Sequence, residues 1–260
     1  MKKYELLIDD TIDVFGVTLF RIKALISFGN VAKGDLGGYI KKEDNLSHSG
    51  NAWVYGNARV YGNARVSGNA WVYGKAEVSG NAWVYGNAEV SGNARVSGNA
   101  EVSGKAEVSG NAWVYGNAEV YGNARVYGNA EVYGKAEVYG KAEVYGNAEV
   151  YGKAEVSGNA WVYGNAEVSG NAEVYGNAEV SGKAEVYGNA DYIVFKNHWS
   201  SGRYFTYTKS NKMWKVGCFY GTGQELIEKA YRDSENSGKN YEAYVKFVEK
   251  LEEINNEKHN

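Results

Sequence analysis

The sequence contains no proline, one cysteine, three histidines and no long apolar run. The single thiol, Cys218, excludes an intrachain disulfide framework and suits a reducing compartment. Charged residues interrupt the N-terminal segment from Lys2 onward, and no run of about 18 apolar residues occurs, so we expect neither a secretory signal nor a membrane partner. The absence of proline fits a backbone whose N–H groups are committed to sheet ladders. The sequence therefore predicts a cytoplasmic protein.

Acidic and basic residues nearly balance, with 28 lysines and arginines against 31 aspartates and glutamates. The chain therefore lacks the basic excess on which nucleic-acid binding depends, and we expect no nucleic-acid partner. The hydrophobic content of 44% is that of a globular protein.

The sequence is dominated by one hexapeptide, repeated without insertion from residue 49 to residue 186. The unit is [Ser/Tyr]-Gly-[Asn/Lys]-Ala-[Trp/Arg/Glu]-Val, and this stretch holds 23 copies of it. A unit this small cannot bury its own apolar face, so the copies must stack on one another. In each copy Ala-x-Val alternates as a short strand does, whereas [Ser/Tyr]-Gly-[Asn/Lys] has turn chemistry. The repeat therefore predicts a strand followed by a corner.

A chain that turns the same way after each short strand winds into a prism. Three hexads close a triangular coil, and the 23 copies plus a variant hexad at 187–192 give eight coils. Alanine and valine are expected to point inward, and the residue between them outward. Positions three hexads apart should then stack as columns, and the corner tyrosines are expected to form ladders at 115–133–151 and 127–145–163. Trp53 and Trp71 begin the first outward column, Arg59 begins the second, and Arg65 begins the third, which ends at Asp191.

This unit resembles the hexapeptide repeat of left-handed parallel β-helix proteins. Their repeat places an aliphatic residue inward, a small residue four positions later, and glycine and asparagine near the turn. Val54, Gly56, Asn57 and Ala58 match that description. The left hand is implied by the resemblance alone, because the handedness rule for crossovers favours the opposite hand.

Two N-terminal stretches are also similar to proteins encoded by bacteriophages and prophages that lead into such repeats. They are Gly16-Val-Thr-Leu-Phe-Arg-Ile-Lys-Ala-Leu and Gly34-Asp-Leu-Gly-Gly-Tyr-Ile, followed by Asn45-Leu-Ser. Those proteins are often labelled acyltransferases. The resemblance implies a protein of phage or prophage origin that works in the cytoplasm of a bacterial host cell.

The predicted fold class is an all-β solenoid, a left-handed triangular parallel β-helix of about eight coils with a module at each end. We divide the chain into an N-terminal capping segment (1–48), the β-helix (49–192) and a small α+β C-terminal module (193–260).

In the capping segment, the runs Tyr4 to Ile8 and Val17 to Leu25 have strand patterns, and Gly34 to Gly38 has the composition of a turn. Stepping back in sixes from Ala52 reaches Leu46 and Ile40, so the apolar register is expected to begin before the perfect repeat.

The C-terminal module has strand patterns at Tyr192 to Lys196, Tyr204 to Thr208 and Met213 to Phe219. Thr222-Gly-Gln-Glu225 is a capping box that should open a helix. A second amphipathic helix is expected from about Lys239.

The sequence does not favour catalysis. Enzymes of the family that the repeat resembles use histidine as a general base in acyl transfer or as a zinc ligand. The repeat contains none, and His48, His198 and His259 lie outside it. We expect no catalytic residue, metal or cofactor, and we keep a hexapeptide-repeat acyltransferase with an acyl-CoA donor as the alternative. A dyad of Cys218 and His198 is far less favoured than a packed cysteine.

We therefore expect a non-enzymatic structural or interaction protein, with the β-helix as rigid spacer and assembly surface. The C-terminal module would be the binding or oligomerisation unit. The partners expected are a second copy of the chain and a bacterial host protein. Instead of forming a binding surface, the aromatic columns could serve to stabilise one another. The alternative to a binding site in the module is an ordinary amphipathic hairpin. The candidate binding residues are Lys196, His198, Trp199, Arg203 and Tyr207 in the module, with Trp53 and Trp71 on the rod.

Overall fold

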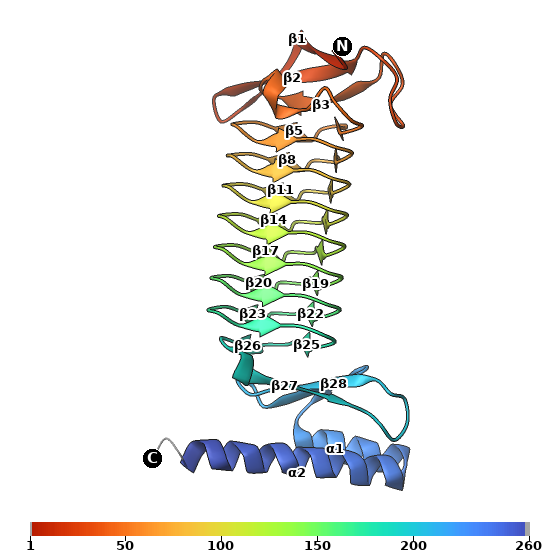
Figure 1. Ribbon diagram of the computed structural model, residues 1–260, viewed down its shortest axis with the longest axis vertical. Coiled ribbons are helices and arrows are strands. Elements are labelled where there is room, and N and C mark those ends of the chain that lie inside the picture. Colours follow the sequence, from red (N-terminus) through yellow and green to blue (C-terminus); the bar gives the residue numbers. More distant parts are fainter. Residues whose placement is uncertain (1, 258–260) are drawn as a thin grey trace.

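The hexapeptide repeat forms 23 two-residue strands, from β4 (Trp53–Val54) to β26 (Glu185–Val186), one in every hexad. In the computed structural model, which describes residues 2–257, every third strand pairs in parallel. The strands therefore fall into three sheets that form the sides of a rod (Figure 1). Paired residues are three hexads apart, as Val114 and Val132 are. The parallel solenoid of about eight coils is confirmed, and its left-handed winding stays a prediction.

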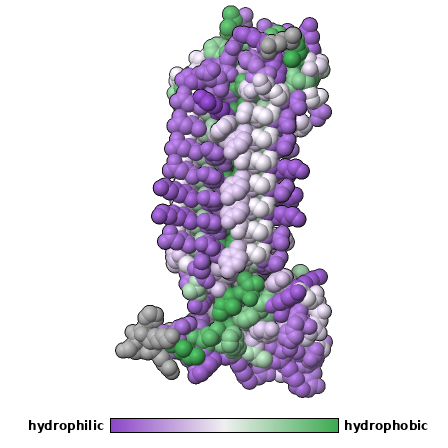
Figure 2. Space-filling model, viewed as in Figure 1, coloured by the Kyte–Doolittle hydropathy of each residue, from purple (hydrophilic) through white to green (hydrophobic). Residues whose placement is uncertain are grey.

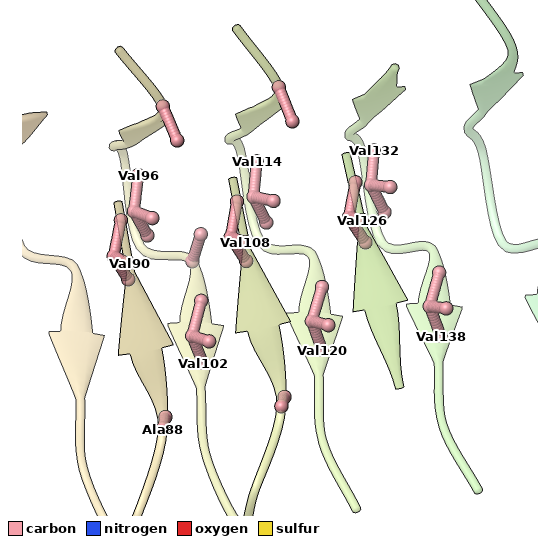
Figure 3. Packing of buried hydrophobic residues seen from close by; sticks show 14 of the residues in the cluster. Ala88, Val90, Val96, Val102, Val108, Val114, Val120, Val126, Val132 and Val138 are labelled. Atoms are coloured by element: carbon pink, nitrogen blue, oxygen red, sulfur yellow. The ribbon is translucent and has the colours of Figure 1, made fainter. Parts of the chain in front are cut away.

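The core of the rod is a stack of alanines and valines. Each of these side chains from Ala70 to Val186 is 0% exposed, and Figure 3 shows the valines of successive coils in register along the axis. Burying a valine is worth roughly 1.5 to 3 kcal/mol, so each three-valine coil adds substantially to stability. The predicted inward positions of alanine and valine are therefore confirmed for the repeat.

The corners depend on glycine because adjacent coils touch there. At Gly128, φ is 74°, and a β carbon would lie 3.0 Å from the backbone nitrogen of Gly146 in the next coil. The following residue, Asn129, donates its backbone N–H to the Gly146 carbonyl at 2.7 Å. Its side-chain amide donates to Asn147 at 3.0 Å, which is one bond in a ladder of corner asparagines. Glycine and asparagine thus couple each corner to the next.

The N-terminal cap (residues 2–48) extends one side of the rod. Strands β1 (Tyr4–Val14), β2 (Val17–Ala24) and β3 (Leu36–Ile40) form an antiparallel meander, and β3 then pairs in parallel with β5 (Arg59–Val60). A short 3₁₀ turn, η1 (Glu43–Asn45), leads into the first coil.

Two predictions for this cap were wrong in detail. The first strand continues past Ile8, because a register shift between Leu7 and Thr11 absorbs the acidic residues that suggested a break. Gly37 and Gly38 lie in β3 rather than in a turn. A β carbon on either glycine would lie within about 2.6 Å of a carbonyl oxygen of the first coils, so close approach explains them better than turn chemistry.

The apolar register does begin before the perfect repeat. Ile40 pairs with Val60 and Leu46 with Val66, and both side chains are buried. Each pair is two positions further apart than the pairs within the repeat, so Ile40 and Leu46 occupy valine positions of the core. This offset between cap and rod could not be read from the hexapeptide period.

The C-terminal module (residues 192–257) consists of a four-stranded antiparallel sheet and two helices. Its sheet crosses the end of the rod, and the helices cover the sheet from the far side (Figure 1). The elements are β27 (Tyr192–Lys196), β28 (Tyr204–Thr208), β29 (Met213–Val216), β30 (Phe219–Gly221), α1 (Gly223–Asp233) and α2 (Glu235–Glu257).

The module also corrects three predictions. The third expected strand is a hairpin, because Gly217 turns the chain with a φ of 55°. The second helix begins at Glu235, before Lys239. Asp191 lies in the 3₁₀ turn η2 (Asn189–Asp191) and not in the third outward column, because its carboxylate accepts the backbone N–H groups of residues 187 and 188 at 2.8 Å. None of the described helices is long and apolar enough to cross a membrane.

Candidate functional site

The strands of the first coil have carbonyl groups with no preceding coil to pair with. Side chains of the N-terminal cap donate hydrogen bonds to them. The Lys3 ammonium donates to the carbonyl of Ala52 at 2.8 Å, and the Asn45 amide donates to the carbonyl of Ala64 at 2.7 Å. The sheet that begins with β5 needs no such side-chain donor, because β3 pairs with β5 directly. Lys3 is only 1% exposed, and burial lowers its pKa to about 8. A buried lysine, held by carbonyl acceptors, thus closes a sheet edge.

The last coil has the opposite chemistry, because its strands expose N–H groups. One strand in each sheet donates to a side-chain oxygen from the chain that follows the repeat. The bonds run from the backbone nitrogen of Glu173 to Asn189 Oδ1 (2.7 Å), from Glu179 to Thr206 Oγ1 (2.9 Å), and from Glu185 to Ser210 Oγ (2.8 Å). Both ends of the rod are therefore closed by groups of matching polarity, which removes the open edges that template end-to-end association.

The outer surface of the rod is organised by contacts between a corner residue and an outward residue of the next coil. A corner tyrosine donates its hydroxyl to the outward glutamate, as Tyr115 does to Glu131 at 3.1 Å. Where the outward residue is tryptophan, a corner serine can accept instead, as Ser97 does from Trp113 Nε1 at 3.1 Å. The other tyrosine–glutamate pairs are 73–89, 85–101, 121–137, 127–143, 133–149, 139–155, 151–167 and 163–179.

The predicted tyrosine ladders are confirmed. The rings of Tyr115, Tyr133 and Tyr151 stack with centroids 4.8 to 5.0 Å apart, and a ladder at 127–145–163 matches it. A further pair, Tyr121 and Tyr139, stacks at 5.0 Å and was missed, although the same spacing of three hexads reveals it. Burial and the Glu131 carboxylate raise the pKa of Tyr115 to about 12. Stacking and hydrogen bonding favour mutual stabilisation as the role of these columns.

The two rod tryptophans proposed for binding have different environments. Trp53 is fully buried, because the N-terminal cap folds over it and packs Tyr4 and Phe28 against its ring. The expectation that Trp53 faces solvent is therefore wrong. Trp71 is half-buried and meets the Tyr55 ring at 5.6 Å.

The five module candidates do not form one surface. Tyr207 is 3% exposed and donates its hydroxyl to Glu252 of α2, so its expected exposure is wrong. Trp199 is half-buried against Tyr241, with ring centroids 4.8 Å apart. Both lie on the face of the sheet that the helices cover, a fact that strand parity alone did not reveal.

The other three candidates are exposed but separate. The Lys196 ammonium lies 5.6 Å from the Tyr204 ring, and His198 lies against α2 with Nδ1 3.4 Å from the Tyr244 hydroxyl. Arg203 faces a groove between the module and the rod. Cys218 is exposed in the β29–β30 turn, and within residues 2–255 it has no contact with His198 that would form a dyad. His259 lies outside the described residues.

The junction groove is the open space between the last coils and the C-terminal sheet. Its volume is about 300 Å³, and its walls are Asn159, Trp161, Asn177 and Glu179 from the rod with Arg203, Tyr204 and Gly217 from the module. A neighbouring hollow of about 490 Å³ shares Asn177 and Tyr204 with it. Figure 2 shows apolar side chains gathered where the rod meets the module. No sequence pattern pointed to this groove, because its two walls are brought together only by the seating of β28 on the rod.

The fold and its closed ends define a β-solenoid repeat protein, in which a parallel solenoid carries a β-rich cap and an α+β module. The family model described as YdcK beta solenoid repeat matches residues 58–74, 88–104 and 118–134, all within the rod. No curated protein matches the chain.

Proposed function

We propose that this chain is a non-enzymatic structural or interaction protein of phage or prophage type. The solenoid acts as a rigid spacer and assembly surface, and the C-terminal module acts as the binding or oligomerisation unit. The observation that carries the proposal is the closure of both rod ends by side chains of the flanking segments, with a uniform repeat between them. Such a rod can gain or lose coils without disturbing either end, which suits a spacer.

Removing one coil tests the spacer role. Deletion of residues 121–138 takes out three hexads and leaves both sets of end contacts in place. The shortened chain should stay folded by circular dichroism, and its rod should be shorter by ~4.8 Å in small-angle X-ray scattering. Binding by the module end should be unchanged. A shortened chain that unfolds, or that loses binding while module variants keep it, would contradict the proposal.

Self-association is expected through the module. Helix α2 exposes Phe247 at 52% and also Ile254, and a spacing of two helical turns places both on one helix face. Phe247→Glu should lower the apparent mass of the full chain in sedimentation velocity, whereas Glu249→Lys on the same helix should not. An unchanged mass for Phe247→Glu would remove this helix face from the proposal.

The alternative function is acyl transfer from an acyl-CoA donor. It would need a general base at a coil corner. Within the described residues the module has one histidine, His198, and it contacts Trp199 and Tyr244 rather than a coil corner. Titration of the full chain with acetyl-CoA distinguishes acyl transfer from the non-enzymatic role. A saturable isotherm, lost in His198→Ala, would favour the enzyme over the spacer.

A further inference from the structure

We propose that the junction groove binds an acidic oligosaccharide. This inference rests on the proposed binding role of the module end and names the chemistry of the ligand. It is carried by an exposed aromatic ring on each wall, a set of hydrogen-bond donors without protein partners, and an arginine, Arg203, that forms no ion pair within the described residues.

Trp161 differs from the rod tryptophans that have a serine at the corner of the preceding coil. Trp83 and Trp113 donate their indole N–H groups to such serines at 3.1 Å. The corresponding residue for Trp161 is Tyr145, whose ring stacks on Tyr163 at 4.8 Å. Among the described residues, no acceptor bonds the Trp161 indole nitrogen, and the side chain is 41% exposed in the groove. The ring and its N–H are therefore open to a ligand.

The other groove residues add further hydrogen-bond donors. The Asn159 amide donates to the Asn177 side-chain oxygen at 3.2 Å, and the Asn177 amide nitrogen has no hydrogen-bond acceptor within the described residues. The Arg203 guanidinium and the Tyr204 hydroxyl have no hydrogen-bond partner within residues 2–255. Three kinds of N–H or O–H group therefore converge on the same space.

The one carboxylate among the groove's lining residues is already engaged. Glu179 accepts from the Tyr163 hydroxyl at 3.5 Å and lies 3.8 Å from the Lys215 ammonium. Since Lys215 offsets Glu179, the Arg203 charge is left without a counterion in the groove as described. A ligand that brings its own carboxylate can form a charge-assisted, bidentate pair with this guanidinium.

A sugar acid has all the features that these walls require. The apolar C–H face of a pyranose ring can lie flat on the indole of Trp161 or the phenol of Tyr204, where aromatic rings give area and orientation. Its hydroxyl and carboxylate oxygens accept from the unpartnered donors. The neighbouring hollow shares Asn177 and Tyr204, so the site extends beyond one ring and suits an oligomer.

The surroundings of the groove disfavour a nucleic acid. Trp161 lies between Glu143 and Glu179 in its column, so repulsion by these carboxylates rises with the charge density of the ligand. Duplex DNA carries one charge per ~1.7 Å, far denser than one carboxylate for each sugar or pair of sugars.

The test is isothermal titration of the full chain with defined hexasaccharides, supported by tryptophan fluorescence. The acidic probes are a galacturonate hexamer and a hexamer of alternating glucuronate and N-acetylglucosamine, and the neutral probe is cellohexaose. We expect saturable binding of at least one acidic hexamer, at least about tenfold tighter than the neutral one. Failure of both acidic hexamers to saturate the protein overturns the inference, as does tighter binding of a hexa-aspartate peptide.

Matched variants locate the site. Trp161→Ala and Arg203→Gln should each weaken binding of the acidic hexamer by about tenfold, as expected for groups at the centre of a contact. Trp113→Ala is the control, because that indole occupies the same place in its hexad but lies outside the groove. Thermal melts establish that each variant is folded. Equal losses for Trp113→Ala and Trp161→Ala overturn the assignment of the site.

The chain lacking residues 121–138 keeps the groove and should bind the hexamer with unchanged affinity. Loss of saccharide binding in that chain contradicts the site. If the acidic hexamers fail to bind but the shortened chain stays folded, only the proposed ligand is refuted. If the shortened chain unfolds, the proposed spacer role of the rod is refuted.

Discussion

One added methyl group at a corner glycine tests whether successive coils are in contact there. Gly128 and Gly176 have nearly the same backbone, with φ of 74° and 72°. A β carbon on Gly128 would lie 3.0 Å from the nitrogen and 3.1 Å from the oxygen of Gly146, whereas one on Gly176 would have no atom within 4 Å. The two alanine variants therefore share backbone strain and differ in the contact with the coil below.

The expected losses follow from these two effects. Left-handed backbone costs a residue other than glycine roughly 1 to 2 kcal/mol, and both variants incur it. Overpacking typically adds about 1 to 3 kcal/mol, and at Gly128 it acts beside the short hydrogen bond from Asn129 to Gly146. We expect Gly128→Ala to lose about 2 to 5 kcal/mol of unfolding free energy and Gly176→Ala about 1 to 2 kcal/mol.

Equilibrium denaturation in urea, followed by circular dichroism and tryptophan fluorescence, measures the two losses. Coincidence of the two probes checks that the rod unfolds as a unit, which repeat proteins do not always do. A larger fall in midpoint for Gly128→Ala is the expected result. Equal falls in the two variants would refute the reasoning, because they would show that the spacing of the coils adjusts freely to a methyl group.

Three other perturbations test the core, the closed end and the surface network. Val132→Asp should lose at least about 4 kcal/mol because it buries an unpaired charge, whereas Glu131→Gln should stay within ~0.5 kcal/mol; equal thermal melts would refute the inward and outward assignment. Thr206→Val should lose about 1 to 3 kcal/mol because it leaves the Glu179 N–H without an acceptor, and unchanged denaturation would show that this contact does not close the end. The pKa of Tyr115 is raised from 10.0, its ordinary value, to about 12 in the folded chain. The hydrogen-bonded phenol therefore contributes to the free energy of unfolding below pH 10, and this contribution is lost as the pH rises to about 12. Melts across that range should show a smaller alkaline loss for Tyr115→Phe than for the unaltered chain, and an equal loss would contradict the effect.

The repeat could be predicted because its signals are local. A hexapeptide period with one glycine in every unit determines strand, corner and core at once, and stacking by three hexads then places Tyr133 on Tyr115. The C-terminal helix α1 was equally predictable, since the Thr222 and Glu225 capping box is read from one short segment. Each of these features depends on residues that are close in sequence or that lie a fixed number of hexads apart.

The candidate site was predicted less well, because it depends on which face of a short sheet is covered. Arg203 and Tyr207 share strand parity, yet Tyr207 is buried under α2 while Arg203 faces the groove. Trp161 looked like every other outward tryptophan of the repeat. Its difference lies in Tyr145, which takes the place that Ser97 has for Trp113, a relation that becomes meaningful only when the coil is built.

The sequence by itself determined the rod: its three sides, its alanine and valine core, its tyrosine columns and the extent of the repeat. Only the tertiary structure decided how the rod ends. The burial of Trp53 beneath Phe28, the closure of strand edges by Lys3 and Thr206, and the groove beside Trp161 all arise where a non-repetitive segment folds over a terminal coil. The physical reason is that a period specifies contacts between like units, whereas an end must be satisfied by chemistry from elsewhere in the chain.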